Sequence, residues 1–250
     1  MEFVLLLFAL SVPFWLVGVV ADRQLLPGLP VVDALVAFCP VAAATILVHR
    51  EKRSTKMLLA RAFDYRRIRA KVWYLPTVLL APAVAVVAYG LMRATHEPLP
   101  PPHIPVLAAP LMLLGFFVGG IGEEVGWTGY ATERLRASRT GLETGILVGL
   151  AWAAWHVPQL VQLHRTPAWI CWWCAGTVAS RVLIVWIYEN TGRSVFAAVS
   201  FHAMQNLSWQ LFPTGAAQWD PRLNALVLLL VVVIVVGIWG PRTLSSVRPN

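Results

Sequence analysis

A series of apolar stretches, each about 18 to 22 residues long, constrains this chain more than any other feature of its sequence. At a rise of about 1.5 Å per residue, a helix of that length crosses a hydrocarbon core of about 30 Å. The composition agrees, because 58% of the residues are hydrophobic, only 13% are charged and the mean hydropathy is +0.67. We therefore expect an all-α, polytopic membrane protein.

The chain is expected to form one membrane-embedded domain, residues 1–250, with about eight helical spans. We keep the first apolar stretch as a span because no basic segment precedes it and no small-residue cleavage site follows it. The predicted spans cover residues 3–20, 30–48, 72–92, 106–127, 143–162, 168–189, 194–212 and 223–240. The three cysteines fall inside apolar runs, so we expect no disulfide framework.

The basic residues follow a membrane topology. Residues 49–71 hold nine Lys and Arg residues, which the positive-inside rule places in the cytoplasm. Eight crossings then put both termini in the cytoplasm, together with fifteen of the twenty basic residues. The net charge of +8 therefore predicts no nucleic-acid partner. Residues 57–74 are expected to form a surface helix on the cytoplasmic leaflet, and the excess of Arg over Lys indicates a bacterial inner membrane.

Ionisable residues inside the predicted spans are few. Glu123 and Glu124 are adjacent in the fourth span, and only His156 and His202 among six histidines lie deep in spans. Such groups cost roughly 2.5 to 3.5 kcal/mol each on insertion scales, so they normally line a cavity, pair with each other or serve a function. A polar network that only holds helices together is the structural alternative.

The spacing of these residues brings chemical groups together. Successive helical residues point about 100° apart, so one of the two adjacent carboxylates faces a given site while the other turns toward a neighbouring helix. His202 and Asn206 lie four residues apart and project from adjacent turns of one face. An imidazole and an amide placed in this way suit hydrogen bonding to an oxyanion.

The order Glu-Glu, aromatic-xxx-His and His-xxx-Asn resembles the three motifs of the CAAX prenyl endopeptidase and bacteriocin-processing family of intramembrane proteases, also called the CPBP or Abi group. The motif core covers residues 115–210. The resemblance implies peptide-bond hydrolysis by a water molecule. The implied roles are water activation by Glu123 with His156, orientation of the site by Glu124, oxyanion stabilisation by His202 and Asn206, and support from Trp127, Thr128 and Trp152.

Two positions depart from the family pattern. The first motif usually reads EExxxR, but Thr128 stands where the arginine would be, and Trp152 replaces the usual phenylalanine. A threonine hydroxyl can donate one hydrogen bond to Glu124, whereas a guanidinium would hold the carboxylate ionised and oriented. Arg134 or Arg136 is a candidate substitute. We expect Arg181, inside the sixth span, to form an ion pair with an acid such as Glu189.

The resemblance implies a membrane-associated protein or peptide as substrate. A cytoplasm-facing site is expected because the two glutamates lie only about ten residues before Arg134. No cofactor is expected. A zinc-dependent hydrolase is the nearest alternative, since Glu, His, His and Asn could surround Zn²⁺, but HExxH spacing is absent.

Two alternatives from other classes stay open. A proton-coupled carrier would use intramembrane Glu and His residues as a relay, with Asp33 and Arg181 adding charge along the path. Such carriers usually show two comparable halves, and no internal repeat is visible. A catalytically silent scaffold for a partner membrane protein is the second alternative, and Thr128 is its best support.

Overall fold

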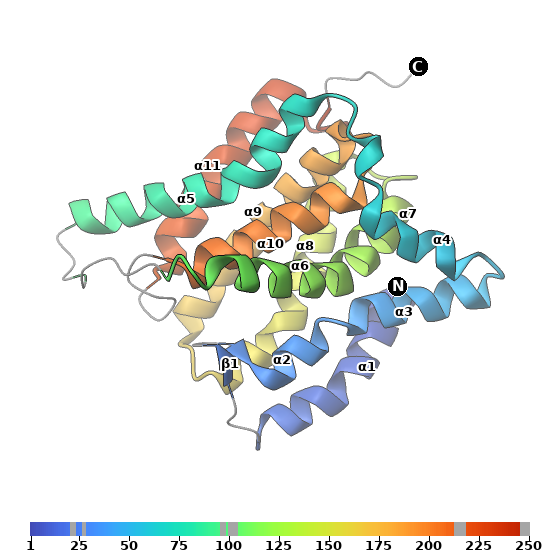
Figure 1. The fold of residues 1–250 in the computed structure, drawn as a ribbon, viewed down its shortest axis with the longest axis horizontal. Coiled ribbons are helices and arrows are strands. Elements are labelled where there is room, and N and C mark those ends of the chain that lie inside the picture. The colour runs from blue at the N-terminus through green and yellow to red at the C-terminus, as the bar shows by residue number, and fades with distance from the viewer. Residues whose placement is uncertain (21–23, 27–28, 96–98, 100–104, 213–218, 246–250) are drawn as a thin grey trace.

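The computed structural model describes residues 1–20, 24–26, 29–95, 99, 105–212 and 219–245, and it is a bundle of helices (Figure 1). The predicted all-α class is therefore confirmed. The long helices are α1 (Glu2–Gly18), α3 (Cys39–Arg50), α5 (Tyr74–Ala94), α6 (Ala109–Gly126), α8 (Gly141–Gln162), α9 (Pro167–Asn190), α10 (Val195–Gln210) and α11 (Pro221–Trp239).

Short elements connect or extend these helices. Strands β1 (Gln24–Leu26) and β2 (Leu29–Pro30) form a small antiparallel pair. The short helical pieces are α2 (Val31–Val36), α4 (Thr55–Ala60), the 3-10 turns η1 (Arg61–Phe63), η2 (Tyr65–Arg67) and η3 (Lys71–Trp73), the π-helical turn η4 (Trp127–Thr132) and α7 (Glu133–Leu135). The π-helical turn directly follows the two glutamates of α6, and such turns are frequent at functional sites.

Six helical segments in the described part of the chain are long and apolar enough to cross a membrane. They cover residues 31–50, 71–94, 109–135, 141–162, 167–190 and 221–239. The other two predicted spans are also helical but shorter, because α1 has 17 residues and α10 has 16. A multi-pass membrane protein is thus supported, while the predicted number of eight spans is not confirmed.

The two ends of the bundle differ in charge. We define the basic end as residues 49–73, 133–140, 190–195 and 239–245. Hydrogen bonds join these segments, since Arg67 donates to the Gly192 carbonyl and Asn190 donates to the Leu244 carbonyl. The N-terminus lies at this end, beside α3, against which α1 packs (Figure 1). The two ends of the described chain therefore share one side of the bundle, and the opposite end carries far fewer basic residues.

The prediction of one surface helix over residues 57–74 was wrong. The segment instead folds as α4 followed by three 3-10 turns. Asp64, between the first two turns, caps the start of α10: its carboxylate accepts hydrogen bonds from the Ser194 hydroxyl (2.8 Å) and the Phe196 amide (3.1 Å). The basic segment therefore packs against the helix that carries His202, rather than lying apart from the bundle.

Glycines allow α6 to pack closely against α3 and its preceding residues. A Cβ atom on Gly126 would lie 2.4 Å from the Pro40 carbonyl oxygen, and one on Gly122 would lie 2.5 Å from the Ala37 carbonyl oxygen. Gly119 and Gly115, one and two turns before Gly122, have no such neighbour within 4 Å and line the cavity described below. The same helix therefore packs with one face and leaves space with another.

We expect Gly126→Ala to lower the free energy of unfolding by about 1–3 kcal/mol, because the new methyl group would collide with backbone atoms that cannot move aside. Gly237→Ala is the matched control, since no atom lies within 4 Å of a Cβ at that position. Its effect should stay below about 1 kcal/mol. Denaturation in detergent measures the free energy of unfolding of each variant. Equal stabilities of the two variants would contradict the close packing of α6.

Candidate active site

Glu124 forms the centre of a buried polar cluster. Its side chain is fully buried, as is that of Arg181 on α9. The Arg181 guanidinium binds both carboxylate oxygens, with Nη1–Oε2 and Nη2–Oε1 distances of 2.7 and 3.0 Å. The Thr128 hydroxyl donates to Oε2 at 2.5 Å, and His202 Nδ1 lies 2.8 Å from Oε1. Four contacts from three elements thus use the hydrogen-bonding capacity of this carboxylate.

The partner of Arg181 differs from the predicted one. Glu189 pairs with Arg136 (2.7 Å) at the basic end, and Arg181 pairs with Glu124 instead. The guanidinium that is missing from position 128 is therefore supplied by α9, and Thr128 lies between the two groups, with Arg181 Nη1 3.3 Å from its hydroxyl oxygen. Arg134, the other predicted substitute, pairs with Glu51.

Sequence reasoning had a signal for Arg181. It is the only charged residue between Ala168 and Ile187 of its span, and a charge in that position needs a partner from another helix. Spacing along one helix could not identify that partner, because residues 124 and 181 come together only through the packing of α6 and α9.

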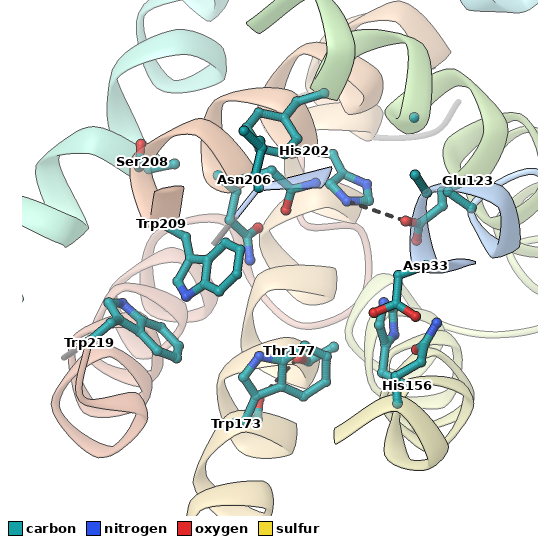
Figure 2. A pocket seen from close by; sticks show the side chains of 18 of the residues that line it. Asp33, Glu123, His156, Trp173, Thr177, His202, Asn206, Ser208, Trp209 and Trp219 are labelled. Atoms are coloured by element: carbon teal, nitrogen blue, oxygen red, sulfur yellow. Dashed lines mark hydrogen bonds and ion pairs between the residues drawn. The ribbon is translucent and has the colours of Figure 1, made fainter. Parts of the chain in front are cut away.

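Glu123 has a different environment, as the spacing on α6 predicted. Its Oε2 accepts a hydrogen bond from the Trp152 indole N–H at 2.7 Å. Its Oε1 lies 3.9 Å from His202 Nε2, which is too long for a hydrogen bond. Glu123 lines the cavity shown in Figure 2. One carboxylate is thus saturated by the protein, and the other keeps an oxygen available to water or substrate.

The orientations of the two histidines follow from their contacts. His156 Nδ1 lies 2.9 Å from the Trp152 carbonyl oxygen, which can only accept, so Nδ1 carries the proton and Nε2 is left free. In His202, Nδ1 faces the Glu124 carboxylate and Nε2 faces Glu123. A carboxylate that holds Nδ1 fixes the direction in which Nε2 points.

Three further predicted residues, Asn206, Trp152 and Trp127, lie at different places relative to the cavity and the polar cluster. Asn206 lies one turn after His202, is half-buried and lines the same cavity. Trp152 contacts groups around both glutamates. Its indole N–H donates a hydrogen bond to Glu123, and its ring lies 4.1 Å from the centre of the guanidinium of Arg181, which is the partner of Glu124. Trp127 is fully buried and packs against the rings of Phe3 and Trp155, and its supporting role stays a prediction.

The cavity has a volume of about 690 Å³. Its inner wall presents Glu123, His156, His202 and Asn206, and most of its remaining wall is apolar or aromatic. In Figure 2, Glu123, His202 and Asn206 lie together on one side, with His156 below Glu123. This arrangement places a free carboxylate oxygen, two imidazoles and an amide around one space inside a membrane bundle, as hydrolysis of a bound amide requires.

Comparison with known proteins agrees with this geometry. The family model for "Type II CAAX prenyl endopeptidase Rce1-like" proteins matches residues 105–208, a range that includes the two glutamates, both cavity histidines and Asn206. A protein of Methanococcus maripaludis named "CAAX prenyl protease 2" is 23% identical over 232 residues, which cover 85% of this chain and 80% of that protein. The resemblance seen in the motifs is thus confirmed, because both matches are to CAAX prenyl proteases, and they indicate that this chain is a protease that acts on peptide bonds.

Proposed function

We propose that the chain is a single-domain intramembrane endopeptidase of a bacterial inner membrane that hydrolyses a membrane-associated protein or peptide. Glu123 acts as the general base. The observation that carries this proposal is the division of labour between the adjacent glutamates: Arg181, Thr128 and His202 saturate Glu124, while Glu123 faces the cavity with one oxygen free.

The proposed reaction begins with a water molecule held beside Glu123. The Oε1 carboxylate oxygen removes a proton from this water molecule, and the oxygen of the water attacks the scissile carbonyl carbon at the same time. The unprotonated Nε2 of His156 accepts a second hydrogen bond from the same water and orients it. The proton on Glu123 then passes to the leaving nitrogen as the carbon–nitrogen bond breaks, which returns the carboxylate to its starting state.

The negative charge that develops on the carbonyl oxygen is stabilised from α10. His202 donates through Nε2–H and Asn206 donates through its side-chain amide, both from the cavity wall. Glu124 supports this role because it binds Nδ1 of His202 and thereby stabilises a protonated imidazole with Nε2–H directed toward the cavity. Glu124 is therefore a positioning residue rather than a base.

A direct test is hydrolysis by the reconstituted protein. Proteoliposomes containing wild type or Glu123→Ala would be incubated in ¹⁸O-labelled water with membrane proteins from a strain that lacks this chain. We expect new C-termini that carry ¹⁸O with the wild type only, because hydrolysis inserts one water oxygen into the new carboxylate. Equal sets of termini with both proteins would contradict the proposal.

Asn206→Ala should reduce the cleavage rate on the order of 10²–10³-fold, the usual cost of one oxyanion donor. The fold should be retained, because Asn206 is half-buried and lines the cavity. Asn206→Asp is the informative companion, since it keeps the shape of the side chain but replaces the donor by a charge that repels the oxyanion. An active Asn206→Asp variant would show that the amide donates nothing to the reaction.

Metal independence is part of the proposal and predicts that chelators leave cleavage unchanged. Among the described residues, no three His, Cys, Asp or Glu side chains are arranged to hold a metal ion. The measurement is the cleavage rate after dialysis against EDTA and 1,10-phenanthroline, with and without added zinc. Activity that disappears and returns with zinc would favour the zinc-dependent alternative.

A further inference from the structure

The cavity wall holds a second carboxylate that the proposed reaction does not use. Asp33, on the short helix α2, is half-buried and lines the cavity together with Glu123 and His156. Figure 2 shows its side chain on the same side of the cavity as these two residues. A carboxylate inside a membrane bundle is costly unless it has a partner or a function. The position of Asp33 therefore needs an explanation.

The charge of Asp33 has no cationic partner in the part of the chain that the structure describes. Glu124 pairs with Arg181, but the side chain that interacts with Asp33 is the uncharged amide of Gln159. Among the described residues, Arg165 is the one Lys or Arg in the cavity wall. Its guanidinium lies over the ring of Trp169 instead, 4.7 Å from the ring centroid.

Gln159, on α8, adds an acceptor beside this carboxylate. Its side-chain amide donates a hydrogen bond to Asp33, so Nε2 faces the carboxylate and Oε1 is directed away from it. Gln159 is only 6% exposed and lines the cavity, and its Oε1 atom has no hydrogen-bond partner among the described residues. A buried acceptor without a donor is unfavourable, and a bound ligand can supply the donor. The pair therefore offers acceptor oxygens to a ligand rich in N–H groups.

Helix geometry places this pair relative to the reacting atoms. His156 and Gln159 are three residues apart on one face of α8, which corresponds to a rise of about 4.5 Å along the helix. An extended peptide advances by about 3.3 Å per residue. A peptide whose scissile bond lies beside His156 would therefore bring a side chain one or two residues away to Asp33 and Gln159.

We propose that Asp33 and Gln159 form a substrate subsite for a lysine or arginine side chain close to the scissile bond. An ammonium or guanidinium group carries only donors and supplies the positive charge that Asp33 lacks. Its methylene chain can lie along the apolar and aromatic part of the wall, to which Trp173 belongs. Neutral and acidic side chains would leave the two acceptors unpaired. This assignment rests on the proposed function, because it defines the substrate class of the same site.

Peptide binding tests the subsite without a known substrate. The probes are three capped pentapeptides, identical except for lysine, leucine or glutamate at the central position between leucines. Equilibrium dialysis measures their binding to proteoliposomes, and protein-free liposomes give the part that dissolves in lipid. All proteins carry Glu123→Ala, which prevents hydrolysis and removes the other carboxylate that faces the cavity.

The variants separate the charge of Asp33 from its shape. Asp33→Asn keeps the shape and removes the charge, whereas Asp33→Glu keeps the charge. Gln159→Met keeps the length of that side chain without its acceptor, and it gives a second measurement if Asp33→Asn accumulates poorly. Glu2→Gln is the matched control, since Glu2 is an exposed acid that does not line the cavity.

We expect the lysine peptide to bind about 10- to 100-fold more tightly than the other two, the usual effect of a hydrogen bond to a charged group. Asp33→Asn should remove this preference and Gln159→Met should weaken it, while Asp33→Glu and Glu2→Gln should retain it. Equal binding of the three peptides before any change at Asp33 would overturn the proposal. A preference that survives Asp33→Asn, with only the thermal stability lowered, would also overturn it and leave Asp33 a structural role.

The subsite and the protease activity can fail separately, because binding is measured in protein that cannot hydrolyse the peptides. A lysine preference that depends on Asp33, together with no ¹⁸O-labelled termini from the wild type, would support the cation site and contradict the protease. Labelled termini from the wild type, together with equal binding of the three peptides, would support the protease and contradict the subsite.

Discussion

Glu123→Gln should abolish most of the cleavage activity, with a fall on the order of 10²–10⁴-fold, while the protein keeps its stability. Glutamine retains the shape of the side chain and an oxygen that accepts from the Trp152 indole, but it cannot take a proton from water. The measurement combines the cleavage rate in proteoliposomes with the midpoint of thermal unfolding in detergent.

Glu124→Gln is the matched comparison on the adjacent residue. It should lower stability as well as activity, because it leaves the fully buried Arg181 without its charge partner. The two isosteric changes thus separate a base from a positioning residue. Equal losses of stability in both variants would contradict the division of roles between the two glutamates.

Arg181→Leu should lower the free energy of unfolding by about 3–5 kcal/mol, the usual cost of leaving one charge of a buried ion pair unpaired. Its partner Glu124 has no exposed surface and would keep only the Thr128 hydroxyl and the His202 imidazole. Activity should fall with stability, because the carboxylate that holds His202 loses its orientation. Denaturant titration in mixed micelles gives the difference in stability.

A second change restores the arginine to the position that the family motif gives it. Residue 128 lies one turn after Glu124, so the double variant Thr128→Arg with Arg181→Leu can place a guanidinium on the same carboxylate from α6. We expect this variant to recover a substantial part of both stability and activity. Arg222→Leu is the control for loss of a basic residue, since that side chain is 54% exposed and its ion pair should contribute less than about 1 kcal/mol. A double variant no better than Arg181→Leu would contradict an equivalent role for the two arginine positions.

The elements that the sequence predicts well are those with a long apolar pattern. The predicted ranges 72–92, 143–162 and 168–189 lie inside or nearly inside α5 with its preceding turn, α8 and α9. Length and hydropathy alone determine such segments. The short α10 has a mixed composition, and its place inside the bundle depends on packing against α5, α6 and α9.

The site was predicted where it depends on spacing along one helix. The different environments of Glu123 and Glu124, and the shared face of His202 and Asn206, follow from helix geometry. The partner of Arg181 depends instead on how two helices pack, which no single-helix pattern contains.

The fold of residues 57–74 was not predicted correctly for a similar reason. The apolar and basic residues of this segment suit a surface helix. In the structure, however, the Asp64 carboxylate accepts a hydrogen bond from Ser194 at the start of α10, and Arg61 donates to Tyr188 and to the Arg193 carbonyl. These tertiary contacts outweigh the local preference for a helix and divide the segment into short turns.

The most direct test of the central claim is made in cells. Membrane proteins from cells that carry wild type, Glu123→Ala or His202→Ala would be compared by mass spectrometry of their termini, after all three proteins are shown to accumulate equally. Our account predicts that one common set of termini disappears in both variants, which would also identify the substrate. Unchanged termini in both variants, with the folded proteins present, would contradict it and favour a scaffold or a carrier.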